Sequence, residues 1–224
     1  MRYFKLSLVL VALTFGLSAC GESHSWRQKT IIEVETPHGL VSGGSVVQVN
    51  LRWFGQLEQD LAQGHAVNAS SSGEASFVEV MPGKYLFALS VSDPSERTLM
   101  TFGGDVDAYG RLKEDTKTIS RRIPWLRETR AIPAKFYPML VTFDDINDPK
   151  SVKKVDPANL AASFGSGVSL KSISLEITDE PVTEGKVEAV LGWLAALKGG
   201  YLSGEFANDG RYYGLHGGNF RSRQ

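Results

Sequence analysis

The sequence has little of several features that mark particular classes of protein. Cys20 is the only cysteine among 224 residues, which excludes a disulfide within the chain and a zinc site built from several thiolates. The formal net charge is −1, whereas nucleic-acid-binding domains present a strongly basic face. We therefore expect no nucleic-acid partner, and a domain stabilised by an ordinary apolar core.

Motifs of the common enzyme classes are also missing. The chain has four histidines, and none has a second histidine or an acid at the helical spacing of a zinc site. Gly-x-Ser-x-Gly does not occur, and the nearest imitation, Ser166 directly between Gly165 and Gly167, has the wrong spacing. Phosphate-binding loops and dinucleotide fingerprints are absent as well. The sequence predicts no metal and no cofactor, and it favours a role without catalysis over an enzymatic one.

The first 19 residues have the three-part pattern of a secretory signal. Arg2 and Lys5 supply positive charge before the apolar run Leu6–Phe15. That run is too short to cross a bilayer, because a membrane-spanning helix needs about 20 residues. Removal of this segment takes away two cations and no acid, which leaves a net charge of −3. We therefore exclude residues 1–19 from the fold.

Leu17-Ser18-Ala19-Cys20 resembles the lipobox of bacterial lipoproteins, in which leucine and small residues precede a lipid-accepting cysteine. The alternative is an ordinary signal peptide that leaves Cys20 as a stray thiol. The resemblance implies cleavage between Ala19 and Cys20, a diacylglyceryl thioether on the sulfur, and an acyl chain such as palmitate on the new amino group. Two or more chains hold a protein stably on a membrane. Because Gly21 replaces the aspartate that causes inner-membrane retention, the resemblance implies the outer membrane, facing the periplasm.

The patterning of the remaining chain predicts an α+β, β-dominated fold. We expect an N-terminal antiparallel β-sandwich-like unit, followed by a smaller α+β unit with one amphipathic helix. The predicted segments are a signal peptide (1–19), a flexible tether (20–28), the β-sandwich-like unit (29–92), an irregular basic connector (93–134) and the α+β unit (135–224). One domain over 29–224 is the alternative.

The β-sandwich-like unit contains two pairs of alternating segments, each pair joined by a turn signal. The turns are Pro37-His38-Gly39 and Met81-Pro82-Gly83. The predicted strands cover residues 29–36, 45–53, 75–80 and 84–91, with a polar loop over 55–73. Together with the Pro-Gly-x-Tyr step at 82–85, these runs resemble small prealbumin-like or immunoglobulin-like sandwich modules.

Between Arg111 and Arg130 the connector gathers seven cations, interleaved with Glu114, Asp115 and Glu128. The cations are Arg111, Lys113, Lys117, Arg121, Arg122, Arg127 and Arg130. One reading is a basic flap that meets anionic headgroups or another envelope polymer. The other reading, which the interleaved acids favour, is a solvated and partly helical connector.

The α+β unit is more regular. Tyr137–Phe143 and Leu170–Thr178 are predicted strands. Asp156 can cap a short helix that begins at Pro157 and stops at Gly165. Apolar residues at three- and four-residue spacing predict an amphipathic helix over Lys186–Lys198, closed by a glycine pair.

Three strings in this unit carry a second resemblance. They are Pro-Met-Leu-Val-Thr-Phe (138–143), Asp-Ile-Asn-Asp-Pro-Lys-Ser-Val (145–152) and Glu-Ile-Thr-Asp-Glu-Pro-Val-Thr (176–183). The block from Tyr137 to Leu197 resembles an uncharacterised family of Gram-negative bacterial lipoproteins. This implies an envelope lipoprotein and no particular activity.

Two groups of residues are candidates for binding. Asp144, Asp145 and Asp148 form the densest acidic cluster, but the loop fails the EF-hand pattern of glycine at its sixth position and glutamate at its twelfth. A looser cation site and a turn held by Asp side chains are the two readings. Tyr212 and Tyr213 are adjacent, so on a strand one ring points away from the core and offers a contact surface.

Three functions agree with these observations. The first is a non-catalytic lipoprotein, held on the membrane through Cys20, that binds or scaffolds an envelope protein or peptidoglycan. The second is a periplasmic hydrolase acting on peptidoglycan or lipid, with His216 and Asp209 in a triad assembled in space. The third is a prophage-type exclusion or inhibitor lipoprotein. The anchor and the missing catalytic motifs favour the first.

Overall fold

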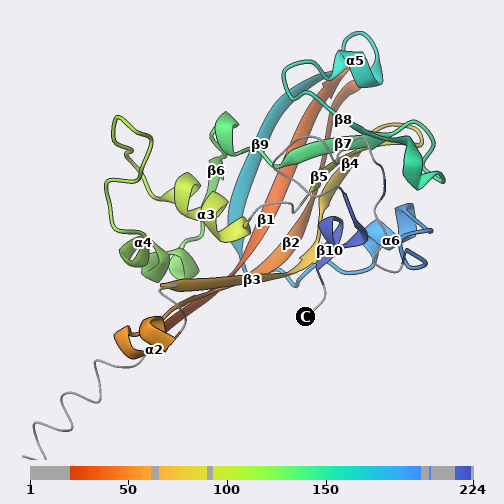
Figure 1. The fold of residues 1–224 in the computed structure, drawn as a ribbon. Coiled ribbons are helices and arrows are strands. Elements are labelled where there is room, and N and C mark those ends of the chain that lie inside the picture. Colours follow the sequence, from red (N-terminus) through yellow and green to blue (C-terminus); the bar gives the residue numbers. More distant parts are fainter. Residues whose placement is uncertain (1–20, 62–65, 90–92, 198–201, 203–214, 223–224) are drawn as a thin grey trace, which may run out of the picture.

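The computed structural model describes residues 21–61, 66–89, 93–197, 202 and 215–222. Two antiparallel sheets dominate it (Figure 1), which confirms the β-dominated α+β class. Five predicted functional residues lie outside the described part of the chain, namely Ala19, Cys20, Asp209, Tyr212 and Tyr213.

The large sheet has six strands in the order β10-β3-β2-β1-β9-β6. They are β1 (Glu22–Thr36), β2 (Gly39–Trp53), β3 (Val67–Glu74), β6 (Thr129–Ala131), β9 (Ser169–Thr178) and β10 (Arg221–Ser222). The first predicted hairpin is confirmed, because β1 and β2 pair from Glu22 opposite Trp53 to Thr36 opposite Gly39. Period-two alternation puts Trp26 and Ile32 on the buried face.

The small sheet has four strands in the order β4-β5-β7-β8 and is covered on both faces. They are β4 (Ser76–Met81), β5 (Lys84–Leu89), β7 (Met139–Phe143) and β8 (Val152–Lys154). Leu86 and Ala88 face the core shared with the large sheet, whereas Phe87 and Leu89 face a second core. Burial on both faces explains why this part of the sequence is continuously apolar.

The second core is an aromatic cluster that holds the C-terminal part of the chain against the small sheet. Phe87, Phe143, Trp193 and Phe220 are linked by ring-centroid distances between 5.6 and 6.4 Å, mostly edge to face. Such pairs contribute about 0.5–1.5 kcal/mol each beyond their buried area. Four segments distant in sequence therefore meet at one point.

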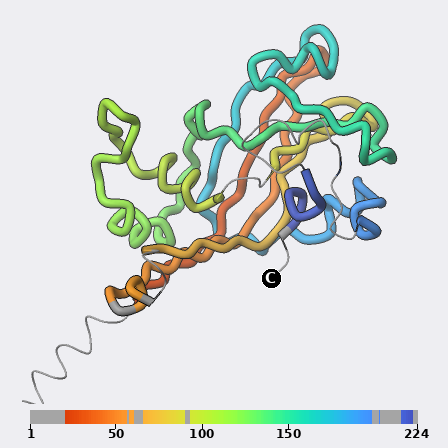
Figure 2. The backbone as a smooth tube through the Cα atoms, in the orientation of Figure 1, coloured from red at the N-terminus to blue at the C-terminus, as the bar shows by residue number. Residues whose placement is uncertain are grey.

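Short helices surround the sheets. They are α2 (Gln56–Leu61), α3 (Pro94–Phe102), α4 (Thr116–Arg122), α5 (Ala161–Phe164) and α6 (Lys186–Val190), with 3-10 turns at Ile123–Trp125, Ala134–Phe136, Pro149–Ser151 and Gly217–Asn219. Figure 2 shows α2 at one end of the long β1–β2 ribbon and α5 at the other. Between them, α3 and α4 lie beside the large sheet.

The two predicted units are interleaved. The large sheet combines β1, β2 and β3 with the late strands β9 and β10, and the small sheet combines β4 and β5 with β7 and β8. Glu74, where the chain leaves the large sheet, is buried and accepts hydrogen bonds from the backbone N–H groups of Gly185, Lys186 and Val187 at 2.5, 3.0 and 3.2 Å. This carboxylate caps α6 from a distant strand, so the sheets do not divide at residues 93–134.

The predicted flexible tether over 20–28 is wrong from Glu22 onward, because these residues belong to β1. Their low apolar content suggested a linker, yet the partners of this strand supply the hydrogen bonds that order it. The polar stretch 67–74 is likewise a strand, β3, paired with β2. Tertiary pairing overrides the weak β propensity of serine and asparagine at both places.

The connector and the helices also differ from expectation. Residues 93–134 are irregular only in part, since they contain α3 and α4, and Asp93 caps α3 by accepting from the N–H of Ser95 at 2.8 Å. The helix expected from Pro157 is confined to α5, which ends at Gly165 with φ 100°. The helix expected over Lys186–Lys198 stops at Val190, and turns follow around Gly192. Glycine is a poor helix former, and burial of Leu191 and Leu194 needs no helix.

Gly43 on β2 lies where the small sheet approaches the large one. A Cβ atom at this position would lie 2.2 Å from the carbonyl oxygen of Phe77 and 2.9 Å from Cα of Val78. Both neighbours are backbone atoms of β4, which cannot rotate away as a side chain can. The absence of a side chain at Gly43 therefore sets the distance between the sheets.

We predict that Gly43→Ala lowers the free energy of unfolding by about 2–3 kcal/mol, because the methyl group must push two packed strands apart. Urea unfolding followed by tryptophan fluorescence measures the change. Gly192→Ala is the matched control, since its Cβ meets no heavy atom within 4 Å, and it should stay within about 0.5 kcal/mol of the wild type. Equal stability of the two variants would contradict this account of the sheet contact.

Candidate functional site

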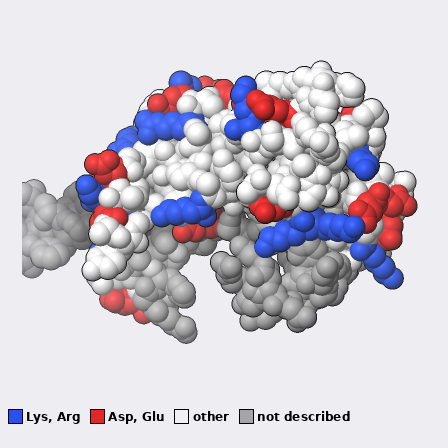
Figure 3. Space-filling model, turned by 90° about the horizontal axis from the view of Figure 1, so that it is seen from above, with Lys and Arg blue, Asp and Glu red and all other residues white. Residues whose placement is uncertain are grey.

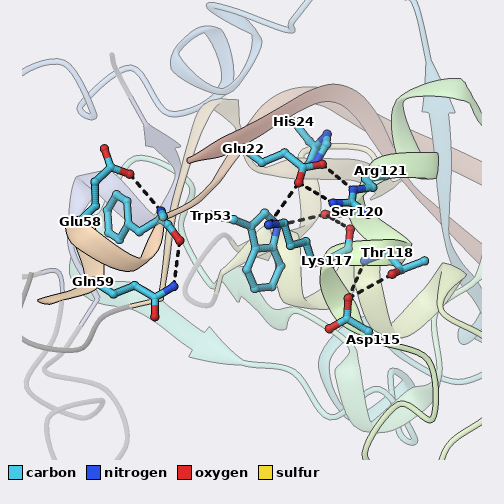
Figure 4. A network of polar contacts seen from close by, with 12 residues as sticks. Glu22, His24, Trp53, Glu58, Gln59, Asp115, Lys117, Thr118, Ser120 and Arg121 are labelled. Carbon is cyan, nitrogen blue, oxygen red and sulfur yellow. Dashed lines mark hydrogen bonds and ion pairs between the residues drawn. The ribbon is translucent and has the colours of Figure 1, made fainter. Parts of the chain in front are cut away.

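One carboxylate fixes the start of β1 to α4 (Figure 4). Arg121 donates from Nε and Nη2 to the two oxygens of Glu22 at 2.6 and 2.7 Å. Lys117 Nζ lies 3.2 Å from the second of these oxygens. Lys117 and Arg121 are four residues apart, which puts both on one face of the helix. We call Glu22, Lys117 and Arg121 the clamp.

Local signals in the sequence hold α4 in place for the clamp. Asp115 caps the helix by accepting from the N–H of Thr118 at 2.9 Å. Trp53, opposite Glu22 in the β1–β2 register, donates from Nε1 to Ser120 Oγ at 3.0 Å. Both strands of the first hairpin are therefore bonded to the same helix.

The clamp is strongly ionic. The hydrogen bonds from Arg121, with Lys117 acting in the same direction and burial opposing them, lower the pKa of Glu22 from 4.5 to about 2. Glu22 in turn raises the pKa of Arg121. Both groups stay charged at neutral pH, so the ion pair between Glu22 and Arg121 is present under physiological conditions.

The groups beside the clamp are not arranged for catalysis. Ser120 Oγ donates to the carbonyl of Lys117 at 2.7 Å while it accepts from Trp53. His24 Nε2 lies 2.9 Å from Glu22 Oε1 without forming a hydrogen bond. A nucleophilic serine needs a base bonded to its hydroxyl, and Ser120 is instead engaged by a backbone carbonyl and an indole. The arrangement can hold a chain segment in place, and it does not activate a nucleophile.

A groove of about 530 Å³ lies near the C-terminal end of α4. Its described lining is Phe102, Gly103, Gly104, Asp105, Lys113, Glu114, Arg122, Leu126, Glu128 and Arg130. The guanidinium of Arg130 lies 5.3 Å from the ring centroid of Phe102, and Arg122 donates to the carbonyl of Phe102 at 3.0 Å. This lining contains no histidine, serine or cysteine among the described residues. It offers charged side chains of both signs over the buried ring of Phe102.

The seven cations between Arg111 and Arg130 are all engaged by acids, which favours the solvated-connector reading over the basic flap. The seven pairs are Arg111–Asp107, Lys113–Asp105, Lys117–Glu22, Arg121–Glu22, Arg122–Glu114, Arg127–Asp179 and Arg130–Glu128. Figure 3 shows basic and acidic atoms intermixed over the face seen from above. Paired surface charges create little long-range field of one sign.

The acidic cluster forms the expected turn. Asp145 accepts from the N–H of Asn147, and Asp148 from the N–H of Lys150, each at 2.9 Å. Asp144 pairs with Lys153 Nζ at 2.5 Å. The three carboxylates thus bond backbone amides and a lysine, and the described part of the chain has no group of three or more His, Cys, Asp or Glu side chains placed to hold a metal ion.

His216 has a structural contact. Its Nδ1 accepts from the N–H of Gly218 at 3.1 Å, and its own N–H donates to Asn219 Oδ1 at 2.9 Å. The described residues therefore show His216 capping a short 3-10 turn. Its predicted partner Asp209 lies outside them, as do Cys20, Tyr212 and Tyr213. Within the described ranges, no helix is long and apolar enough to cross a bilayer.

Sequence reasoning missed the clamp because Glu22 and His24 were assigned to a linker. A signal was present in the alternation of the segment. Larger residues at even positions, such as Glu22, His24 and Trp26, continue the inward face of β1, and serines occupy the odd positions. The other half of the clamp lies on α4, far along the chain, and no spacing rule connects the two.

The comparisons with known proteins found no match. No protein-family model matches the sequence, and no curated protein or solved structure is similar to it at a significant level.

We predict that Glu22→Gln destabilises the fold by about 1 kcal/mol at neutral pH, a modest value because 28% of the Glu22 side chain is exposed and solvent screens the pair. The folded pKa of about 2 lies below the ordinary 4.5, so the carboxylate stabilises the protein fully above pH 4.5 and loses this effect as the pH falls towards 2. The difference from wild type in urea unfolding should therefore shrink in acid. Glu35→Gln, on an exposed residue of the same strand, should show no such dependence. A gap that stays constant with pH would argue against the clamp.

Proposed function

We propose that this protein is a membrane-anchored lipoprotein of the bacterial envelope, held through lipid on Cys20, whose domain binds or scaffolds another envelope component without catalysis. The observation that carries the proposal is the pattern Leu17-Ser18-Ala19-Cys20 behind a short apolar run. The outer membrane, facing the periplasm, is the proposed location because Gly21 follows the cysteine.

The geometry supports a binding domain that is held rigidly next to its point of attachment. β1 begins two residues after Cys20, and the clamp fastens that beginning to α4. The groove near the same helix presents paired charges of both signs, with Arg130 held over the buried ring of Phe102, and this suits a polar chain carrying both acidic and basic groups. We propose that the envelope component binds in this groove. No observation favours hydrolysis or phage exclusion over this role.

The anchor is tested with Cys20→Ser. The wild type should incorporate labelled palmitate and sediment with membranes, whereas the variant should lose the label and leave the membrane or remain unprocessed, because the lipid has no sulfur to join. Ser25→Ala, an exposed position on β1, is the control and should behave as the wild type. Absence of palmitate from the wild type would refute the lipoprotein proposal.

The binding role is tested by cross-linking in cells, followed by purification of the lipidated protein. A species captured by the wild type should be lost in Arg130→Ala, because the side chain stacked on Phe102 is removed from the groove. It should remain in Lys150→Ala, an exposed cation outside the groove. Capture that is equal in both variants would place the binding elsewhere, and no captured species at all would count against the role.

A further inference from the structure

The large sheet has two ends of different character. At one end, Glu22, Trp53 and Val67 stand side by side, because Trp53 pairs with Glu22 on β1 and with Val67 on β3. We call this the anchor end; it also includes Arg52, Phe54, Ala66, helix α2, and Lys117 and Arg121 of the clamp. At the opposite end, the turn at Pro37 and His38 lies against the segment after α5, where a Cβ atom on Gly167 would lie 2.9 Å from Cγ of Pro37. Figure 2 shows the two ends separated by the length of the β1–β2 ribbon.

The reach of the chain restricts where the anchor end can be. Only Gly21 lies between Cys20 and Glu22, and an extended chain covers about 3.3–3.6 Å per residue, so the two steps of this link span roughly 7 Å. Glu22 is itself immobilised by strand pairing and by the clamp. If Cys20 carries lipid, as proposed above, no flexible segment lifts the domain off the bilayer.

The surface of the anchor end suits a phospholipid headgroup layer. Val67 is 40% exposed, and the Arg52 guanidinium lies 5.4 Å from the ring centroid of the half-buried Phe54. Charge is balanced, with the cations Arg52, Lys117 and Arg121 matched by the carboxylates Glu22, Glu58 and Asp60. Arg52 pairs with Glu58, and Glu22 pairs with the other two cations. Such a surface has apolar groups to bury and no net charge that requires anionic lipid.

We infer that the anchor end rests directly on the lipid surface and that the large sheet stands away from it, with the Pro37-His38 turn about 45 Å out. This inference rests on the proposed lipidation of Cys20. It adds the orientation of the domain and the residues that meet the headgroups, and it leaves the groove beside α4 close to the membrane.

The test uses single thiols at the two ends, since lipid consumes the sulfur of Cys20. Val67→Cys and Leu40→Cys, at residues 40% and 50% exposed, are labelled with an environment-sensitive fluorophore in the full lipidated protein. The proteins are reconstituted into phosphatidylcholine vesicles with and without a quencher carried on the lipid headgroup. The probe at position 67 should lose most of its fluorescence, and the probe at position 40 should lose none. Adding phosphatidylglycerol should change neither result.

Each outcome has a separate meaning. Flotation with vesicles but equal quenching at both positions would overturn the inference and leave the anchor intact. Failure to float would overturn the anchor, and the inference with it. Ala66→Cys, on the exposed neighbour of Val67, repeats the measurement if Val67→Cys unfolds at lower urea than the wild type.

Discussion

The fold depends on the pairing of β1 along both of its edges. One edge pairs with β2 over its whole length and the other with β9 from Arg27 to Glu35. A buried strand needs partners for its N–H and C=O groups on both sides, and here one partner is adjacent in sequence while the other arrives from the last third of the chain. The first strand is therefore complete only when the chain as a whole has folded.

Two carboxylates link segments that are distant in sequence, as disulfides do in many other domains. Glu22 ties the start of β1 to α4 through Arg121 and Lys117. Glu74 ties the end of β3 to the start of α6 through three backbone N–H groups. Each link joins segments distant in sequence, and charge-assisted hydrogen bonds are stronger than neutral ones. In a chain with one cysteine, these contacts position the helices on the sheets.

The candidate site follows from this architecture. Because β1 is both the centre of the large sheet and the first element after the proposed anchor, the attachment point and the apolar core share one strand. The groove is lined by residues of α3, α4, the segment between them and β6, the edge strand of the same sheet. A ligand held at Arg130 would therefore lie at a defined distance from the proposed anchor.

Short-range signals in the sequence were sufficient to predict the hairpins and β9. The hairpins follow from turn signals at Pro37-His38 and Pro82-Gly83, and β9 follows from the strict alternation over Leu170–Thr178. Both kinds of signal act between residues that are close in the sequence. They were insufficient to predict that residues 22–28 form a strand, that the polar stretch 67–74 forms β3, and that α6 stops at Val190. Glu22 is ordered by Arg121, and α6 begins where Glu74 accepts its N–H groups.

Local patterns were enough to predict the β-dominated class and the hairpin turns, and the proposed anchor rests on such a pattern alone. The interleaving of the sheets, the clamp and the groove depend on tertiary packing. Each joins groups far apart in the chain, and no local pattern specifies which distant partner satisfies a buried strand or charge.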